Sequence, residues 1–188
     1  MKTRLNKLLT SRITRWGFLA VLLIAVGATV GGTNHRHYQL GGAWVGQVQG
    51  IQWSAIHTPL DPAGQTAAIQ IQFPTYPDAL QAGLLTTFGA DTLSVGVGEL
   101  AMTDRDTAKF TWVAYAVTDA HPPVIKAIWL VNGTWDITGQ DSAMSTETLR
   151  IYAPDADANH DGLPDSNATP LATVPFPPGL NVRVSILP

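Results

Sequence analysis

Residues 109–131 have the sequence KFTWVAYAVTDAHPPVIKAIWLV. Two runs rich in β-branched and aromatic residues, 109–118 and 124–131, are separated by Asp, His and a Pro-Pro pair. Such runs favour strands because their side chains pack well on a pleated surface, whereas Pro and Asp favour turns. The stretch therefore predicts two strands with a turn at His121-Pro-Pro123.

The same pattern extends over the chain from Gly42 onward, where short apolar or alternating runs are separated by Gly, Pro, Asp and Asn. Residues 77–89 differ, because their apolar residues are spaced to line one helix face, and we expect a short helix or an irregular loop there. The other runs predict strands at 43–56, 67–73, 92–102, 134–138, 144–152, 172–176 and 181–187.

Asn132-Gly133 separates the run that ends at Val131 from the run at 134–138. Asn-Gly readily adopts the positive φ angles of a type I′ turn. We therefore expect a tight hairpin at this dipeptide, with the two runs paired.

Eight or nine strands joined mostly by tight turns, without alternating helices, predict an all-β, antiparallel fold. Gly42-Ala-Trp44 at the start of these strands resembles the Gly-x-Trp start of the lipocalins and the wider calycin barrels. The resemblance implies an up-and-down barrel in which Trp44 fills one end and Arg183, on the last strand, packs across it. The chain departs from lipocalins in lacking their C-terminal helix, and a β-sandwich remains the alternative.

Residues 1–15 carry five basic and no acidic residues, and residues 16–30 carry no charge. This order is typical of a secretory signal peptide, since a membrane-spanning helix needs about 20 apolar residues. Small residues before the boundary predict cleavage after Ala28. The alternative is that the segment stays uncleaved as a membrane anchor. We expect membrane contact only in this second case. Both interpretations place the rest of the chain outside the cytoplasm, secreted or periplasmic. The predicted segments are the signal or anchor at 1–28, a tether at 29–41 and a single antiparallel β domain at 42–188.

Cleavage would leave 6 of the 11 basic residues against all 14 acidic ones, a net charge of −8. A nucleic-acid partner is not expected, because phosphate binding needs a basic face. The chain has no Cys, so neither a lipid-modified cysteine nor a disulfide can form.

Residues 155–165, with the sequence DADANHDGLPD, hold four carboxylates and one amide. Calcium takes six to eight oxygen ligands, and alternating acidic residues with Gly at the sixth position wrap a short loop around it. The spacing predicts a structural calcium site. Its expected ligands are Asp155, Asp157, Asn159, Asp161, the backbone carbonyl of Leu163, and Asp165, with Gly162 at the sharp turn.

This loop resembles the calcium loops of dockerins and thrombospondin type 3 repeats. The twelfth position, where an EF-hand has a bidentate Glu, is Ala168, so Asp155, Asn167 or water would have to complete the shell. The alternative is a solvated Asp-Gly turn without an ion.

Catalytic motifs with a nucleophile and its base are missing from the sequence. Glu99 and Glu147 are expected on the wet side of the strands, although they could meet as an acid/base pair at a barrel mouth. His57 is also expected to face solvent. The strand aromatics either fill the core or line a cavity for an apolar ligand; they are Trp44, Trp53, Trp112, Trp129, Trp135, Phe110, Tyr115 and Tyr152.

The leading functional hypothesis is an exported, non-catalytic binding module for a small apolar ligand or an extracellular protein. The alternative is a calcium-stiffened structural or adhesion module, and the least favoured is a barrel hydrolase or isomerase. Interior volume separates the first two, because a packed interior favours surface contacts over ligand carriage.

Overall fold

The computed structural model describes residues 40–73 and 79–184. The predicted export segment at 1–28, most of the tether and the end of the last predicted strand lie outside these residues. Within the two described ranges, no helix has the length and apolar character needed to span a membrane.

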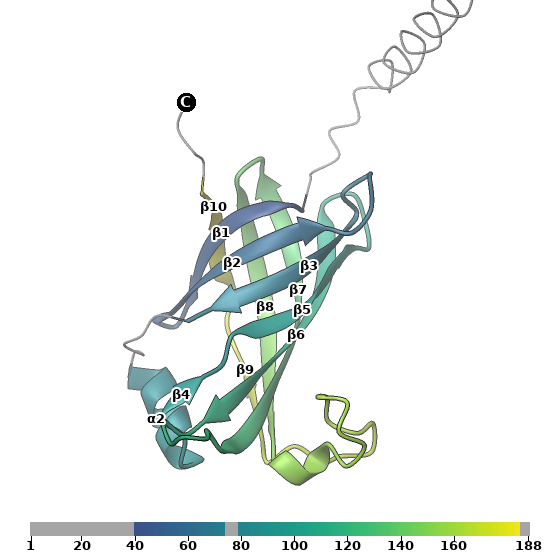
Figure 1. Cartoon of the computed structure of the whole chain (residues 1–188). Coiled ribbons are helices and arrows are strands. Elements are labelled where there is room, and N and C mark those ends of the chain that lie inside the picture. The colour runs from purple at the N-terminus through teal and green to yellow at the C-terminus, as the bar shows by residue number, and fades with distance from the viewer. Residues whose placement is uncertain (1–39, 74–78, 185–188) are drawn as a thin grey trace, which may run out of the picture. The chain divides into compact units, whose positions relative to one another are not determined.

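The described residues form an antiparallel sheet of short strands joined mostly by tight turns (Figure 1). One short helix, α2, covers Ala79–Thr87, within the segment where a helix or loop was expected, and a 3₁₀ turn covers Pro154–Ala156. The strands are β1 (Gly42–Val48), β2 (Ile51–Pro59), β3 (Thr66–Gln72), β4 (Thr92–Leu93), β5 (Gly96–Met102), β6 (Thr107–Val117), β7 (Ile125–Gly139), β8 (Ser142–Tyr152), β9 (Ala172–Pro175) and β10 (Gly179–Arg183).

The sheet closes on itself because β10 pairs with β1 on one side and with β8 on the other. β8 is long enough to pair with β10 through residues 142–145 and with β9 through residues 148–151. The result is a closed, eight-stranded up-and-down barrel of β1, β2, β3, β5, β6, β7, β8 and β10. The all-β barrel is confirmed, and the sandwich alternative is wrong for this chain.

Alternate residues of each strand point into the barrel and form the main core. The interior of an eight-stranded barrel is just wide enough for side chains to fill it or for one small ligand to bind. Large and small residues alternate in this interior, including Trp112 and Ala114 on β6 and Trp129 and Ala127 on β7.

The hairpin predicted at Asn132-Gly133 is wrong, because both residues lie in the middle of the continuous strand β7. Gly133 pairs with Phe110 and Glu147 on the neighbouring strands. A Cβ on Gly133 would lie 2.5 Å from Cζ of Phe110. The glycine is therefore present to admit an aromatic ring, and the chain turns later, between Gly139 and Ser142.

The single strand predicted at 43–56 is also wrong, because the chain turns at Gln49-Gly50 to form the β1–β2 hairpin. Gln49 has a φ of +50° and Gly50 a φ of +92°, as a type I′ turn requires. The predicted strand at 92–102 is likewise divided into β4 and β5.

Gly133→Ala is expected to destabilise the barrel by about 1–3 kcal/mol, because the added methyl group must displace the Phe110 ring or the backbone of β8. Urea unfolding followed by circular dichroism measures the change. The control is Gly83→Ala in α2, where nothing lies within 4 Å of the new methyl group and stability should hold or rise. Equal stability of Gly133→Ala and the parent protein would contradict the packing argument.

Candidate functional site

Trp44 and Arg183 are directly opposite each other on β1 and β10. The guanidinium carbon of Arg183 lies 4.8 Å from the centroid of the Trp44 ring, an arrangement that attracts a cation to the aromatic face. The Trp44 ring also lies 4.6 Å from that of Trp135, and Nε of Arg183 lies 3.9 Å from a carboxylate oxygen of Asp141. These contacts join β1, β7 and β10 near the start of β1.

His57 is buried, so the expectation that it faces solvent is wrong. Alternation along β2 turns Ala55 and His57 inward together. Nδ1 of His57 lies 3.1 Å from the carbonyl oxygen of Leu40 and carries the proton, since a carbonyl can only accept. Burial is the main cause that lowers the pKa of His57 from 6.5 to about 4, so its ring is neutral near pH 7.

Glu147 is also buried, which corrects the expectation of a surface carboxylate. The Ser145 hydroxyl donates to Oε1 of Glu147 over 2.7 Å, and the Asn181 amide nitrogen donates to that hydroxyl oxygen over 3.1 Å. Burial raises the pKa of Glu147, although the hydrogen bond from Ser145 opposes this shift. Glu99 is exposed on the outer face opposite Thr111, so the two glutamates do not meet as an acid/base pair.

A cavity inside the barrel has a volume of about 40 Å³. Sites for drug-sized ligands occupy roughly 300–1,000 Å³, so this cavity is too small for such a ligand. The aromatic side chains both fill the core and line this small space. Its walls are Trp53, Ala55, His57, Ile69, Ile71, Leu100, Phe110, Trp112, Trp135, Ser145, Glu147 and Asn181.

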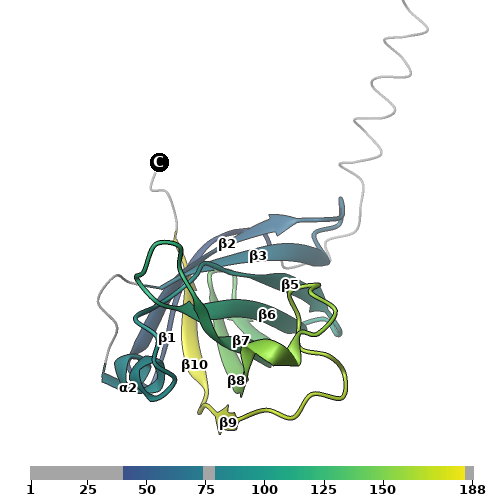
Figure 2. The same ribbon diagram turned by 60° about the horizontal axis from the view of Figure 1, so that its bottom comes forward.

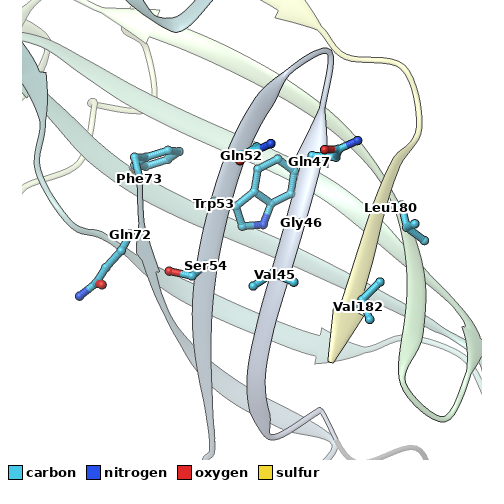
Figure 3. A pocket seen from close by; sticks show the side chains of 10 residues that line it. All are labelled: Val45, Gly46, Gln47, Gln52, Trp53, Ser54, Gln72, Phe73, Leu180 and Val182. Atoms are coloured by element: carbon cyan, nitrogen blue, oxygen red, sulfur yellow. The ribbon is translucent and has the colours of Figure 1, made fainter. Parts of the chain in front are cut away.

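A groove of about 620 Å³ lies across β1, β2, β3 and β10. Figure 3 shows Val45 of β1 beside Ser54 of β2 and Val182 of β10, in agreement with their strand pairing. Gln47 is likewise opposite Gln52 and Leu180. The lining is completed by Gly46, Trp53, Gln72 and Phe73.

The wall that contains this groove has no charged side chain on its outer face. Residues 40–73 contain one charged residue, Asp61, which lies in a turn after β2. On β10 the only charged residue is Arg183, whose guanidinium lies over the Trp44 ring. Three groove residues are apolar yet exposed: Val45 (45%), Leu180 (49%) and Val182 (40%). In contrast, β5–β8 carry the exposed or half-buried charges of Glu99, Lys109, Lys126, Asp136 and Arg150.

The acidic loop follows β8 at the same end of the barrel as α2 (Figure 1). Both carboxylate oxygens of Asp157 accept hydrogen bonds of 3.0 Å, from the backbone amides of Asp161 and Gly162. Gly162 has a φ of +88°, which favours glycine, and its carbonyl accepts a 2.8 Å hydrogen bond from the hydroxyl of Tyr115. Burial, followed by the charges of Asp157 and Asp161, raises the pKa of Tyr115.

Other predicted calcium ligands also contact the loop backbone. Oδ1 of Asn159 accepts from the Asp161 amide at 3.0 Å, and Oδ1 of Asp161 accepts from the Leu163 amide at 2.9 Å. Asp165 accepts from the amide of Ala158 at 3.3 Å, while Asp155 lies on the preceding 3₁₀ turn. Over residues 40–73 and 79–184, no three His, Asp or Glu side chains are grouped closely enough to hold a metal ion.

The acidic loop also covers a second apolar cluster, on the outer face of β6, β7 and β8. Val113, Ile128 and Tyr152 are buried there. Ala156 of the loop and Ala168, three residues after its end, pack against them together with Tyr115 and Leu130. Figure 2 shows the loop running past the barrel between β8 and β9. Holding this loop in place keeps the cluster away from water.

Comparison with known proteins gives no match among family models, curated proteins or solved structures. The site is therefore interpreted from its own geometry.

We expect the barrel to lose about 3 kcal/mol of stability as the pH falls from 6.5 to about 4, because the unfolded chain takes up a proton on His57 that the folded chain excludes. Urea unfolding at a series of pH values measures this slope. In His57→Asn, whose amide can still donate to Leu40, this component of the slope should disappear. The exposed control His121→Asn should keep it, and an unchanged slope in His57→Asn would contradict the assignment.

Proposed function

We propose that this protein is an exported, non-catalytic binding module with a lipocalin-like barrel that contacts an extracytoplasmic protein through the outer wall of β10, β1, β2 and β3. The observation that carries the proposal is the charge-free, partly apolar groove on this wall. Contiguous exposed apolar side chains on a soluble domain commonly mark a protein-binding surface.

The relative volumes favour binding outside the barrel. The groove measures about 620 Å³ and has room for side chains of a partner, whereas the interior cavity measures about 40 Å³. A carrier of a large apolar ligand would need the opposite arrangement. Binding of a protein partner on the outer face is therefore favoured over transport of an apolar ligand inside the barrel.

The lining also indicates what kind of segment would bind. Val45, Leu180 and Val182 offer apolar surface, and the amides of Gln47 and Gln52 can each donate and accept hydrogen bonds. A segment without charges, with apolar side chains and free backbone polar groups, complements this lining. A charged segment would lose hydration here without gaining a partner of opposite charge.

A photo-reactive phenylalanine at position 45, introduced in the cells that make the protein, is expected to give one cross-linked product of defined mass. Val182→Asp should abolish this product, because it places a charge in the groove beside position 45. The same reactive residue at position 125 is the control, since Ile125 is similarly exposed (43%, against 45% for Val45) but lies on β7. Equal products from both positions, or none from position 45, would contradict the proposal.

We also propose that the acidic loop binds Ca²⁺ as a structural ion through Asp155, Asp157, Asn159, Asp161, the carbonyl of Leu163, and Asp165. The spacing of the acidic residues supports the calcium site. So do the side-chain oxygens of Asp157, Asn159 and Asp161, which all accept hydrogen bonds from the backbone amides of residues 161–163. A carboxylate has about four lone-pair sites, so these hydrogen bonds leave acceptor capacity for a cation. The ion would offset the repulsion among the carboxylates and hold the loop over the outer apolar cluster.

Calcium at about 10 mM is expected to raise the stability of the protein by about 1–3 kcal/mol relative to chelator, given affinities of roughly 10⁻⁴–10⁻³ M for extracellular modules. Thermal melts in calcium and in chelator measure the increment. Asp161→Asn should reduce it and Asp104→Asn, in a distant turn, should not. A melting temperature that is indifferent to calcium would contradict the site.

A further inference from the structure

We propose that the interior cavity is a binding site for a small organic ammonium ion, held by the Glu147 carboxylate and the aromatic side chains around it. This inference is independent of the outer groove, because it concerns the inner face of the barrel and a ligand of different chemistry. It rests on the charge, the lining and the size of the cavity.

The Glu147 carboxyl group borders the cavity and has no positively charged partner among the described residues. Glu147 is 7% exposed, and its Oε1 accepts from Ser145. Ser145 is the only side chain of the described residues that is hydrogen-bonded to the Glu147 carboxyl group, and no described Lys or Arg forms an ion pair with it. Its second oxygen, Oε2, is not fully shielded from solvent. A buried carboxylate without a positive partner is costly, so a cation that enters beside it is favoured.

The surrounding titratable groups supply no positive charge. His57 from β2 lines the cavity, but it is neutral near pH 7 because burial lowers its pKa to about 4. Arg183 from β10 lies over the Trp44 ring and near Asp141, and it is not part of the lining. The remaining polar groups of the lining, from Ser145 and Asn181, are uncharged.

Aromatic side chains form much of the remaining wall. Trp53, Phe110, Trp112 and Trp135 come from β2, β6 and β7 and line the same space as Glu147. The faces of aromatic rings attract cations, most strongly where water is excluded. A carboxylate together with several indole rings therefore selects an organic ammonium ion over a neutral molecule of equal size.

The volume limits the ligand to a few atoms. A buried water needs roughly 10–15 Å³ of such space. The cavity of about 40 Å³ therefore accepts about three or four non-hydrogen atoms. Methylammonium and isopropylammonium satisfy this limit, whereas benzylammonium exceeds it.

Binding is linked to release of a proton. Burial raises the pKa of Glu147, so on acidification its carboxyl group takes up a proton more readily than an exposed glutamate does. When the ammonium ion enters, this proton leaves to solvent, and the ion keeps its own protons because aliphatic amines have pKa values of about 10. Affinity should therefore rise with pH until Glu147 is fully ionised.

The test compares isopropylammonium chloride with propan-2-ol, which has nearly the same shape but no charge. The protein is purified from the cells that naturally make it and titrated by calorimetry. Isopropylammonium should bind at least tenfold more tightly than propan-2-ol. In Glu147→Gln, which keeps an acceptor for Ser145, this preference should disappear. Titrations in two buffers of different ionisation enthalpy should report proton release at acidic pH for the parent protein alone, and benzylammonium should not bind.

The comparison of two ligands on the unmutated protein does not depend on how well the variant folds. Equal affinities for isopropylammonium and propan-2-ol would overturn the proposal. So would an unchanged preference in a folded Glu147→Gln, or the lack of binding by either ligand at about 100 mM, which would indicate a cavity occupied by water alone.

Discussion

The double pairing of β10, with β1 and with β8, is the constraint on which the rest of the structure depends. It converts a curved sheet into a closed barrel and leaves its two terminal strands without free edges. Close approach makes it possible: a Cβ on Gly46 would collide with Trp53 and Asn181, and one on Gly179 would lie 2.8 Å from the carbonyl oxygen of Gln47. Glycine at these positions lets the strands meet.

Closure gives the barrel an inner and an outer surface with different chemistry. Inside, Glu147, Ser145 and Asn181 form a hydrogen-bonded chain from β8 to β10, surrounded by apolar side chains. Outside, the strands that β10 joins to β1 form a wall without charge, in a chain whose acidic residues outnumber its basic ones. The same strand pairing therefore creates both proposed binding regions.

The acidic loop adds a second level of organisation at the end of the barrel where β8 ends. It is tied to β6 by the hydrogen bond from Tyr115 to Gly162, and Ala156 of the loop and Ala168 after it pack on the outer cluster around Ile128. Four carboxylates within this short stretch repel one another, so loop order and cluster burial are coupled. A bound cation would act on both at once.

The sequence by itself determined the all-β class, most strand positions and the spacing of the acidic loop, and it left residues 77–89 as either a short helix or a loop. Each of these depends on local preference or on distance along the chain. The sequence did not distinguish Gly50, which turns the chain, from Gly133, which makes room for Phe110, because the difference is in the neighbouring strand. The inward positions of His57 and Glu147, and the choice of barrel over sandwich, were decided by strand register and the pairing of β10. These pairings join residues far apart in the chain, and only the tertiary structure brings them together.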